Sequence, residues 1–193
     1  MTSLNRWVFG ILILIGAGAP LGAWALELSA TQRAELEHPK WLYRPQGYVP
    51  VSNADRSVYV FLSSECPCSD SYVDELNRLA QKFPTVAFVG VHANPVEASP
   101  AALAYFESKA LRFPVIDDQA QTALTVFRAI KTPHAYVVRE RDGKVLYHGG
   151  VGSERHASAE MKHYLEKALE EGDHPQPEQT KTMGCVIERK DSV

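Results

Sequence analysis

Residues 58–62, with the sequence VYVFL, form an unbroken run of β-prone apolar residues. A strand without a polar position is typical of a sheet that is covered on both faces. The segment that follows, residues 69–83, carries apolar side chains at helical spacing on one face: Val73, Leu76, Leu79, Ala80 and Phe83. A second apolar run at residues 86–91 predicts another buried strand. Strand, amphipathic helix and strand in this order favour a parallel βαβ unit.

The remainder of the chain continues this alternation of helices and strands. Ser99-Pro100 predicts a helix start, with Ser as the N-cap and Pro at the first helical position. Arg141-Asp142-Gly143 joins two strand-like runs, which is a strong hairpin signal. The other expected elements are a short strand at 113–116, a helix at 119–128, strands at 135–138 and 145–147, and a helix at 161–169. The sequence therefore predicts a three-layer α/β/α sandwich with a central mixed sheet.

The N-terminus resembles a secretory signal peptide. Arg6 precedes the apolar run WVFGILILIGAGAPLG, and Ala23-Trp24-Ala25 offers a cleavage site. The alternative for residues 1–25 is an uncleaved membrane anchor, because residues 7–25 are close to the roughly 20 needed to span a bilayer. We expect a periplasmic or secreted protein, membrane-anchored if the segment is retained. Residues 26–57 show no sustained periodicity and predict an irregular extension with a helical turn near Gln32 to Leu36.

Charge and cysteine content narrow the classes of function. The formal net charge is −3 with no run of Lys or Arg, so there is no electrostatic footprint for nucleic acid. Three cysteines are too few for a small disulfide-stapled scaffold, although an exported chain permits disulfides. An odd number leaves at least one thiol unpaired in the monomer.

Two of the cysteines, Cys66 and Cys68, flank Pro67 in the segment SSECPCSDSY. This segment lies at a strand-to-helix corner, so both sulfurs are expected in the first helical turn. Free backbone N–H groups and the positive end of the helix dipole stabilise a thiolate there and raise its nucleophilicity. The carboxylate of Glu65 opposes this effect. Buried, inert cysteines are the structural alternative, but the polar neighbours favour a chemical role.

The cysteine corner after a buried strand, and Thr132-Pro133 directly before another strand and a hairpin, resemble the thioredoxin-like superfamily over residues 56–171. The likeness is strongest to its secreted redoxin or peroxiredoxin-like branch. It implies a thioredoxin-like domain over residues 58–171. It also implies a cis peptide bond before Pro133, which shapes a substrate groove against the active-site sulfur together with Thr132 and His134.

A polar C-terminal tail, residues 172–193, carries Cys185 in the segment Gly184-Cys185-Val186-Ile187. Together with Cys66-Pro67, this segment resembles redoxin-domain proteins that combine a Cys-Pro corner with a C-terminal Gly-Cys-x-Ile. Thioredoxins instead have two residues between their cysteines, so a Cys66–Cys68 bridge would be strained. Typical peroxiredoxins have Pro-x-x-x-Thr-x-x-Cys, where this chain has Tyr59 and Ser63.

These observations favour an exported thiol-disulfide oxidoreductase. In this hypothesis Cys66 attacks, and Cys185 or Cys68 resolves the mixed disulfide. The partners would be protein thiols and disulfides or a small peroxide, with an unidentified electron donor and no bound cofactor. A second hypothesis is a copper protein that uses Cys66, Cys68 and His134, because thiolate and imidazole suit Cu(I). A third is a non-catalytic binding domain that kept the fold.

Overall fold

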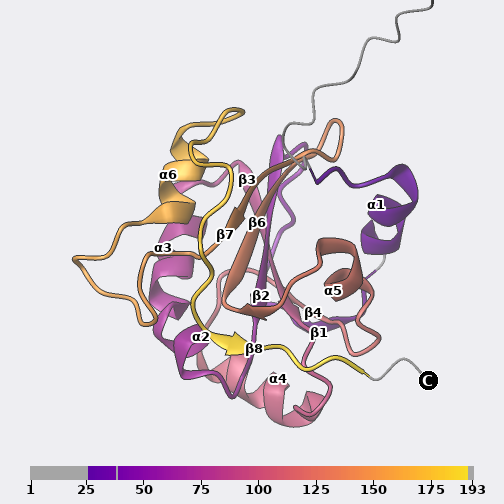
Figure 1. Cartoon of the computed structure of the whole chain (residues 1–193). Coiled ribbons are helices and arrows are strands. Elements are labelled where there is room, and N and C mark those ends of the chain that lie inside the picture. The colour runs from indigo at the N-terminus through magenta and orange to yellow at the C-terminus, as the bar shows by residue number, and fades with distance from the viewer. Residues whose placement is uncertain (1–25, 38, 191–193) are drawn as a thin grey trace, which may run out of the picture.

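The computed structural model describes residues 26–37 and 39–190. Its main sheet has six strands in the order β1-β4-β3-β2-β6-β7 (Figure 1). Three parallel strands form the middle of the sheet: β2 (Arg56–Leu62), β3 (Val86–His92) and β4 (Val115–Asp117). Three antiparallel strands complete it: β6 (His134–Arg139) beside β2, β7 (Val145–Gly149) beside β6, and β1 (Trp41–Tyr43) beside β4. The signal peptide or anchor expected at residues 1–25 lies outside the described residues.

Helices cover both faces of this sheet, so the predicted three-layer α/β sandwich is confirmed. One layer consists of α3 (Val73–Lys82), α4 (Ser99–Ser108) and α6 (Tyr164–Glu170), and the other of α1 (Ala30–Glu37) and α5 (Thr122–Phe127) (Figure 1). Successive side chains of a strand point to opposite faces. Val58 and Val60 of β2 accordingly belong to the core under α3, whereas Phe61 belongs to the core under α5. Both faces of β2 are therefore buried, which explains the apolar run at residues 58–62.

The structure differs from the predicted elements in three places. The extension over residues 26–57 contains the edge strand β1, which was not expected, besides α1, which spans the helical turn expected near Gln32 to Leu36. The helix expected over residues 69–83 is divided at Tyr72 into α2 (Pro67–Ser71) and α3. The polar tail contains β8 (Cys185–Val186), which pairs with β5 (Lys131–Thr132) in a separate two-stranded sheet. Two-residue strands with polar or mixed neighbours give no periodicity that a sequence can reveal.

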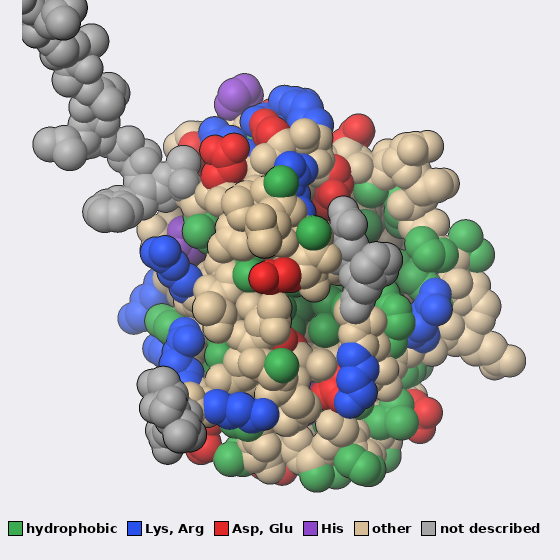
Figure 2. All heavy atoms as spheres, turned by 90° about the vertical axis from the view of Figure 1, so that its right-hand side faces the viewer, with side chains coloured by type: hydrophobic (Ala, Val, Ile, Leu, Met, Phe, Trp, Pro, Cys, Tyr) green, Lys and Arg blue, Asp and Glu red, His purple; other side chains and the backbone are tan. Residues whose placement is uncertain are grey.

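The surface carries both signs of charge. On the face that bears α1 and α5, acidic and basic side chains are interspersed rather than gathered by sign (Figure 2). Within the described ranges, every helix is too short or too polar to cross a bilayer.

Candidate functional site

Cys66 and Cys68 lie at the corner where β2 leads into α2. Cys66 is the N-cap residue of α2, and Pro67 occupies the first turn, where its missing N–H has no intrahelical partner to lose. The two cysteines are 2% and 4% exposed. Because α2 has only five residues, the dipole acting on the sulfurs is smaller than that of the long helix expected from the sequence. Glu65 is exposed, so its carboxylate is screened by solvent.

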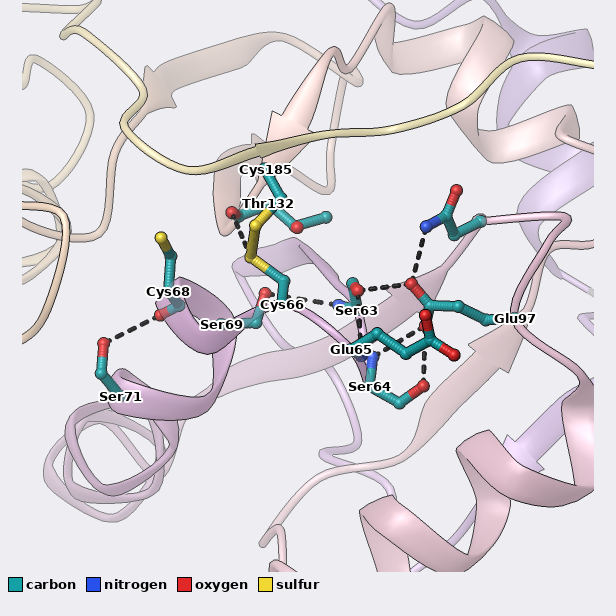
Figure 3. Close-up of a disulfide and its surroundings, with 11 residues drawn as sticks. Ser63, Ser64, Glu65, Cys66, Cys68, Ser69, Ser71, Glu97, Thr132 and Cys185 are labelled. Carbon is teal, nitrogen blue, oxygen red and sulfur yellow. Dashed lines mark hydrogen bonds between the residues drawn. A yellow bond between two sulfur atoms is a disulfide. The ribbon is translucent and has the colours of Figure 1, made fainter.

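Cys66 forms a disulfide bond with Cys185, 119 residues further along the chain (Figure 3). Their Cα atoms are 6.0 Å apart, within the usual range for a disulfide. The pairing of β5 with β8 places Cys185 directly opposite Thr132. The Sγ atom of Cys66 lies 3.4 Å from the carbonyl oxygen of Thr132. Cys68 is the free cysteine and remains buried beside this bridge.

The geometry explains each position of the segment Gly184-Cys185-Val186-Ile187. Gly184 has φ of 156°, and a Cβ atom there would collide with the carbonyl group of Thr132. Cys185 turns towards Cys66, whereas Val186 is 68% exposed. Ile187 is buried in the core under α5. The glycine therefore permits close backbone approach, and the isoleucine anchors the strand that carries the cysteine.

The segment around Cys185, which we call the tail strap (residues 178–190), is held on both sides of the cysteine. Before it, the N–H of Thr180 donates to the carbonyl of His148 at 3.1 Å, and the Thr180 hydroxyl lies 2.6 Å from the Tyr147 hydroxyl. After it, the N–H of Ile187 donates to the carbonyl of Ile130 at 3.1 Å. The polar tail expected from the sequence is thus ordered against the domain. Cys185 is presented to the corner by a fixed segment.

A buried carboxylate, Glu97, supports the corner from the loop that follows β3 (Figure 3). Glu97 is 2% exposed and accepts hydrogen bonds from the Ser63 hydroxyl at 2.5 Å and the Ser64 N–H at 2.8 Å. His92 Nε2 and Asn94 Nδ2 lie 2.9 and 2.6 Å from the same carboxylate. Burial opposes ionisation of Glu97, but these hydrogen bonds outweigh it and lower the pKa to about 2. The ionised carboxylate fixes the residues that precede Cys66.

Glu97 and His92 were not identified from the sequence, although a signal was present. His92 is the last residue of β3, which is parallel to β2, and Glu97 lies in the loop that follows β3. The carboxyl ends of adjacent parallel strands meet at one edge of a sheet, where functional side chains gather in α/β folds. A carboxylate shortly after the second buried strand is therefore a residue type whose position points to the cysteine corner.

Stability should depend on the charge of Glu97. Its folded pKa is below the ordinary value of 4.5, so its contribution is complete above pH 4.5 and is lost as the pH falls towards 2. We expect Glu97→Gln to lower the free energy of unfolding at pH 7 by about 1–3 kcal/mol. Urea unfolding of both proteins at pH 7 and pH 3 measures this difference, which should shrink at the lower pH. An unchanged difference would contradict the assigned role of the charge.

The residues of the expected substrate groove run from the end of β5, at Thr132, through Pro133 to the start of β6, at His134. The peptide bond between Thr132 and Pro133 is cis, as the family resemblance implies. His134 belongs to the face under α5, where its ring packs on Tyr136 at a centroid distance of 4.4 Å. Burial, with a smaller effect from His148, lowers the pKa of His134 to about 3, so the imidazole is neutral. It lines a cavity of about 820 Å³ between α5 and the tail strap.

The structure changes the set of candidate metal ligands. The Sγ atoms of Cys66, Cys68 and Cys185 all lie within 4.8 Å of one another. His134, expected as a ligand with Cys66 and Cys68, is not part of this group. The register of β6 explains the difference, since His134 and Tyr136 share the α5 face of the sheet.

Three features together decide the fold class. The strand order places β2 between a parallel and an antiparallel neighbour, a cysteine corner follows β2, and a cis-proline directly precedes β6. The fold is thioredoxin-like. No protein-family model matches the chain, and no curated protein matches it.

Several solved structures are similar to this chain. A Geobacillus kaustophilus protein described as an uncharacterized conserved protein is 28% identical, with a TM-score of 0.64 over 74% of this chain and 82% of that chain. The hypothetical protein SMc02350 of Sinorhizobium meliloti is 20% identical, with a TM-score of 0.63 over 72% and 82%. A secreted Mycobacterium tuberculosis disulfide oxidoreductase homologous to E. coli DsbE is 19% identical, with a TM-score of 0.43 over 47% and 66%.

Proposed function

We propose that this thioredoxin-like protein is an exported thiol-disulfide oxidoreductase that uses Cys66 as the nucleophile and Cys185 as the resolving cysteine. The Cys66–Cys185 bridge next to Thr132 and Pro133 is the observation that carries the proposal. Cys68 is only two positions from Cys66 in the sequence but remains free. A single residue between Cys66 and Cys68 also disfavours a bridge between them.

The reaction requires two exchange steps. The thiolate of Cys66 attacks one sulfur of a substrate disulfide and releases the first substrate thiol. The thiolate of Cys185 then attacks Cys66 Sγ in the mixed disulfide, releases the second substrate thiol and closes the Cys66–Cys185 bridge. The substrate gains two electrons, and an external dithiol must return two electrons to the bridge. The cycle is reversible, so a sufficiently oxidising partner reverses its direction.

The tail strap controls access to Cys66. In the oxidised structure Cys66 is 2% exposed beneath β8, whereas Cys185 is only partly buried. An incoming thiolate must reach one of the two sulfurs. Cys185 is therefore the accessible sulfur for the reductant, and displacement of residues 181–186 exposes Cys66 for the substrate.

A peroxide is the other substrate class for the same cysteine, and it would pass through a sulfenic acid on Cys66. The Ser63 hydroxyl occupies the position of the peroxiredoxin threonine, but it donates to Glu97. The Ser63 hydroxyl proton is therefore bound to the Glu97 carboxylate and does not stabilise a peroxide oxygen. Exchange with disulfides is the better supported chemistry.

The test is a single turnover of the reduced protein. The reduced chain is mixed with one equivalent of a disulfide-bonded peptide, the remaining thiols are alkylated with iodoacetamide, and the products are mapped without reduction. We expect one peptide disulfide to be consumed, the Cys66–Cys185 bridge to form, and Cys68 to carry the alkyl group. A Cys66–Cys68 bridge, or an unreacted peptide, would refute the proposal. A parallel reaction with hydrogen peroxide shows whether peroxide closes the same bridge faster.

A further inference from the structure

Cys68 has no part in the proposed exchange, yet it lies beside the bridge. Its side chain is 4% exposed, and its Sγ atom is within 4.8 Å of both Cys66 Sγ and Cys185 Sγ. The three sulfurs come from two distant segments, the start of α2 and β8, and lie at one place in the molecule (Figure 3). Reduction of the bridge would leave three thiols in this cluster.

We propose that the reduced protein binds a monovalent copper ion through Cys66, Cys68 and Cys185. Thiolate sulfur is a soft ligand that favours Cu(I) over hard cations. A metal with metal–sulfur bonds of about 2.3 Å holds three sulfurs about 4 Å apart in a trigonal arrangement. The sulfurs already lie within 4.8 Å of one another, so small movements of the side chains bring them to this spacing.

The composition of the cluster favours Cu(I) over Zn²⁺. Structural zinc sites have four protein ligands in tetrahedral arrangement. Within the described residues, the group at this place contains three cysteines and no histidine or carboxylate. Cys66 and Cys68 are also buried, so these two sulfurs lie in surroundings that suit a soft ion with few ligands. A three-coordinate soft ion suits these ligands without a fourth.

Copper binding should depend on the redox state of the protein. In the oxidised chain, Cys66 and Cys185 share the disulfide and provide no thiolate. A dithiol supplies two electrons and two protons to open the bridge. A phosphine supplies the two electrons and becomes a phosphine oxide, and water provides the oxygen and the two protons. Cu(I) then displaces the thiol protons, because only the deprotonated sulfur is a metal ligand. The same three residues therefore bind copper when reduced and form a disulfide when oxidised.

Competition with the chromogenic Cu(I) chelator bicinchoninate tests this proposal on the full chain under anaerobic conditions. The phosphine-reduced protein should remove about one Cu(I) per chain from the chelator, and the oxidised protein should remove none. Cys68→Ser keeps the residues of the bridge, and its affinity should fall on the order of 100-fold because one of the three soft ligands is lost. His134→Gln should retain the affinity, since this residue is outside the cluster. X-ray absorption of the copper complex should show three sulfur ligands.

Several outcomes would overturn the proposal. These are equal copper affinity of the oxidised and reduced proteins, unchanged affinity of Cys68→Ser, or failure of the reduced protein to compete with bicinchoninate. Tighter binding of Zn²⁺ with a nitrogen or oxygen ligand in the absorption spectrum would refute the assignment to copper. Disulfide mapping of Cys68→Ser confirms that the variant still forms the Cys66–Cys185 bridge and is folded. Copper binding is therefore tested independently of thiol-disulfide exchange.

Discussion

Replacing Cys66 by serine is expected to abolish thiol-disulfide exchange, with kcat/KM falling on the order of 1,000-fold or more, because a hydroxyl does not replace the thiolate nucleophile. Cys185→Ser should stop the reaction one step later. In this variant the Cys66 thiolate still attacks the substrate disulfide. The mixed disulfide then persists, because the variant lacks the Cys185 thiolate that would release the second substrate thiol. Turnover should fall about 100-fold or more, since an external thiol must replace a positioned one. Intact-mass measurement should detect the peptide bound to Cys66.

Cys68→Ser is the matched control for both variants. It removes a buried thiol from the same corner and leaves the Cys66–Cys185 bridge in place. We expect Cys68→Ser to retain most of its exchange activity. Accumulation of a mixed disulfide in this variant, or normal turnover of Cys185→Ser, would show that Cys68 is the resolving cysteine.

Opening the Cys66–Cys185 bridge is expected to lower the free energy of unfolding by about 4–5 kcal/mol. The bridge joins residues 119 positions apart, and chain-entropy estimates for rings of this size give that value. The hydrogen bonds of Thr180 and Ile187 keep the tail strap in place after reduction, so the folded state gains little freedom that would offset the loss. Urea unfolding with and without a dithiol measures the difference. Cys68→Ser is the best background, because it cannot reshuffle its disulfide.

The double variant Cys66→Ala/Cys185→Ala provides the control for this measurement. Its stability should be the same with and without the dithiol, and it should resemble that of the reduced parent. A difference of less than about 1 kcal/mol between the oxidised and reduced parent would be far below the chain-entropy value. Such a result would mean that the tail strap detaches from the folded domain on reduction.

The fold was predictable where the pattern of apolar residues was long enough. β2 and β3 were identified because both of their faces are buried, and the β6–β7 hairpin because Asp142-Gly143 supplies the turn. β1 was missed because three residues at a sheet edge carry no periodicity. The break at Tyr72 was missed because its side chain is buried and continues the apolar face. Tertiary packing, rather than local sequence, decides both features.

The cysteines of the candidate site were predicted from the sequence, but the buried carboxylate of Glu97 that holds the cysteine corner was not. The family resemblance brought Cys66, Pro133 and Cys185 into one hypothesis, and the structure brings Cys66 and Cys185 into contact. His134 is outside the group of three sulfurs, because adjacency to Pro133 does not determine which face of β6 a side chain occupies. Glu97 was missed because its five hydrogen-bond contacts join separate segments.

The anchored tail strap places the Cys66–Cys185 bridge in two rings of very different size. In the folded protein, the contacts of Thr180 and Ile187 already join the tail to the domain, so opening the bridge frees only residues 181–186. In the unfolded chain, the same bridge closes a ring of 119 positions. In the folded protein, the bridge closes a short ring that runs through residues 181–186, and the entropy of this ring governs how readily the bridge re-forms during a catalytic cycle. The entropy of the long ring in the unfolded chain governs the contribution of the bridge to the free energy of unfolding. Changes in the anchors can therefore tune the redox equilibrium separately from the contribution of the bridge to global stability.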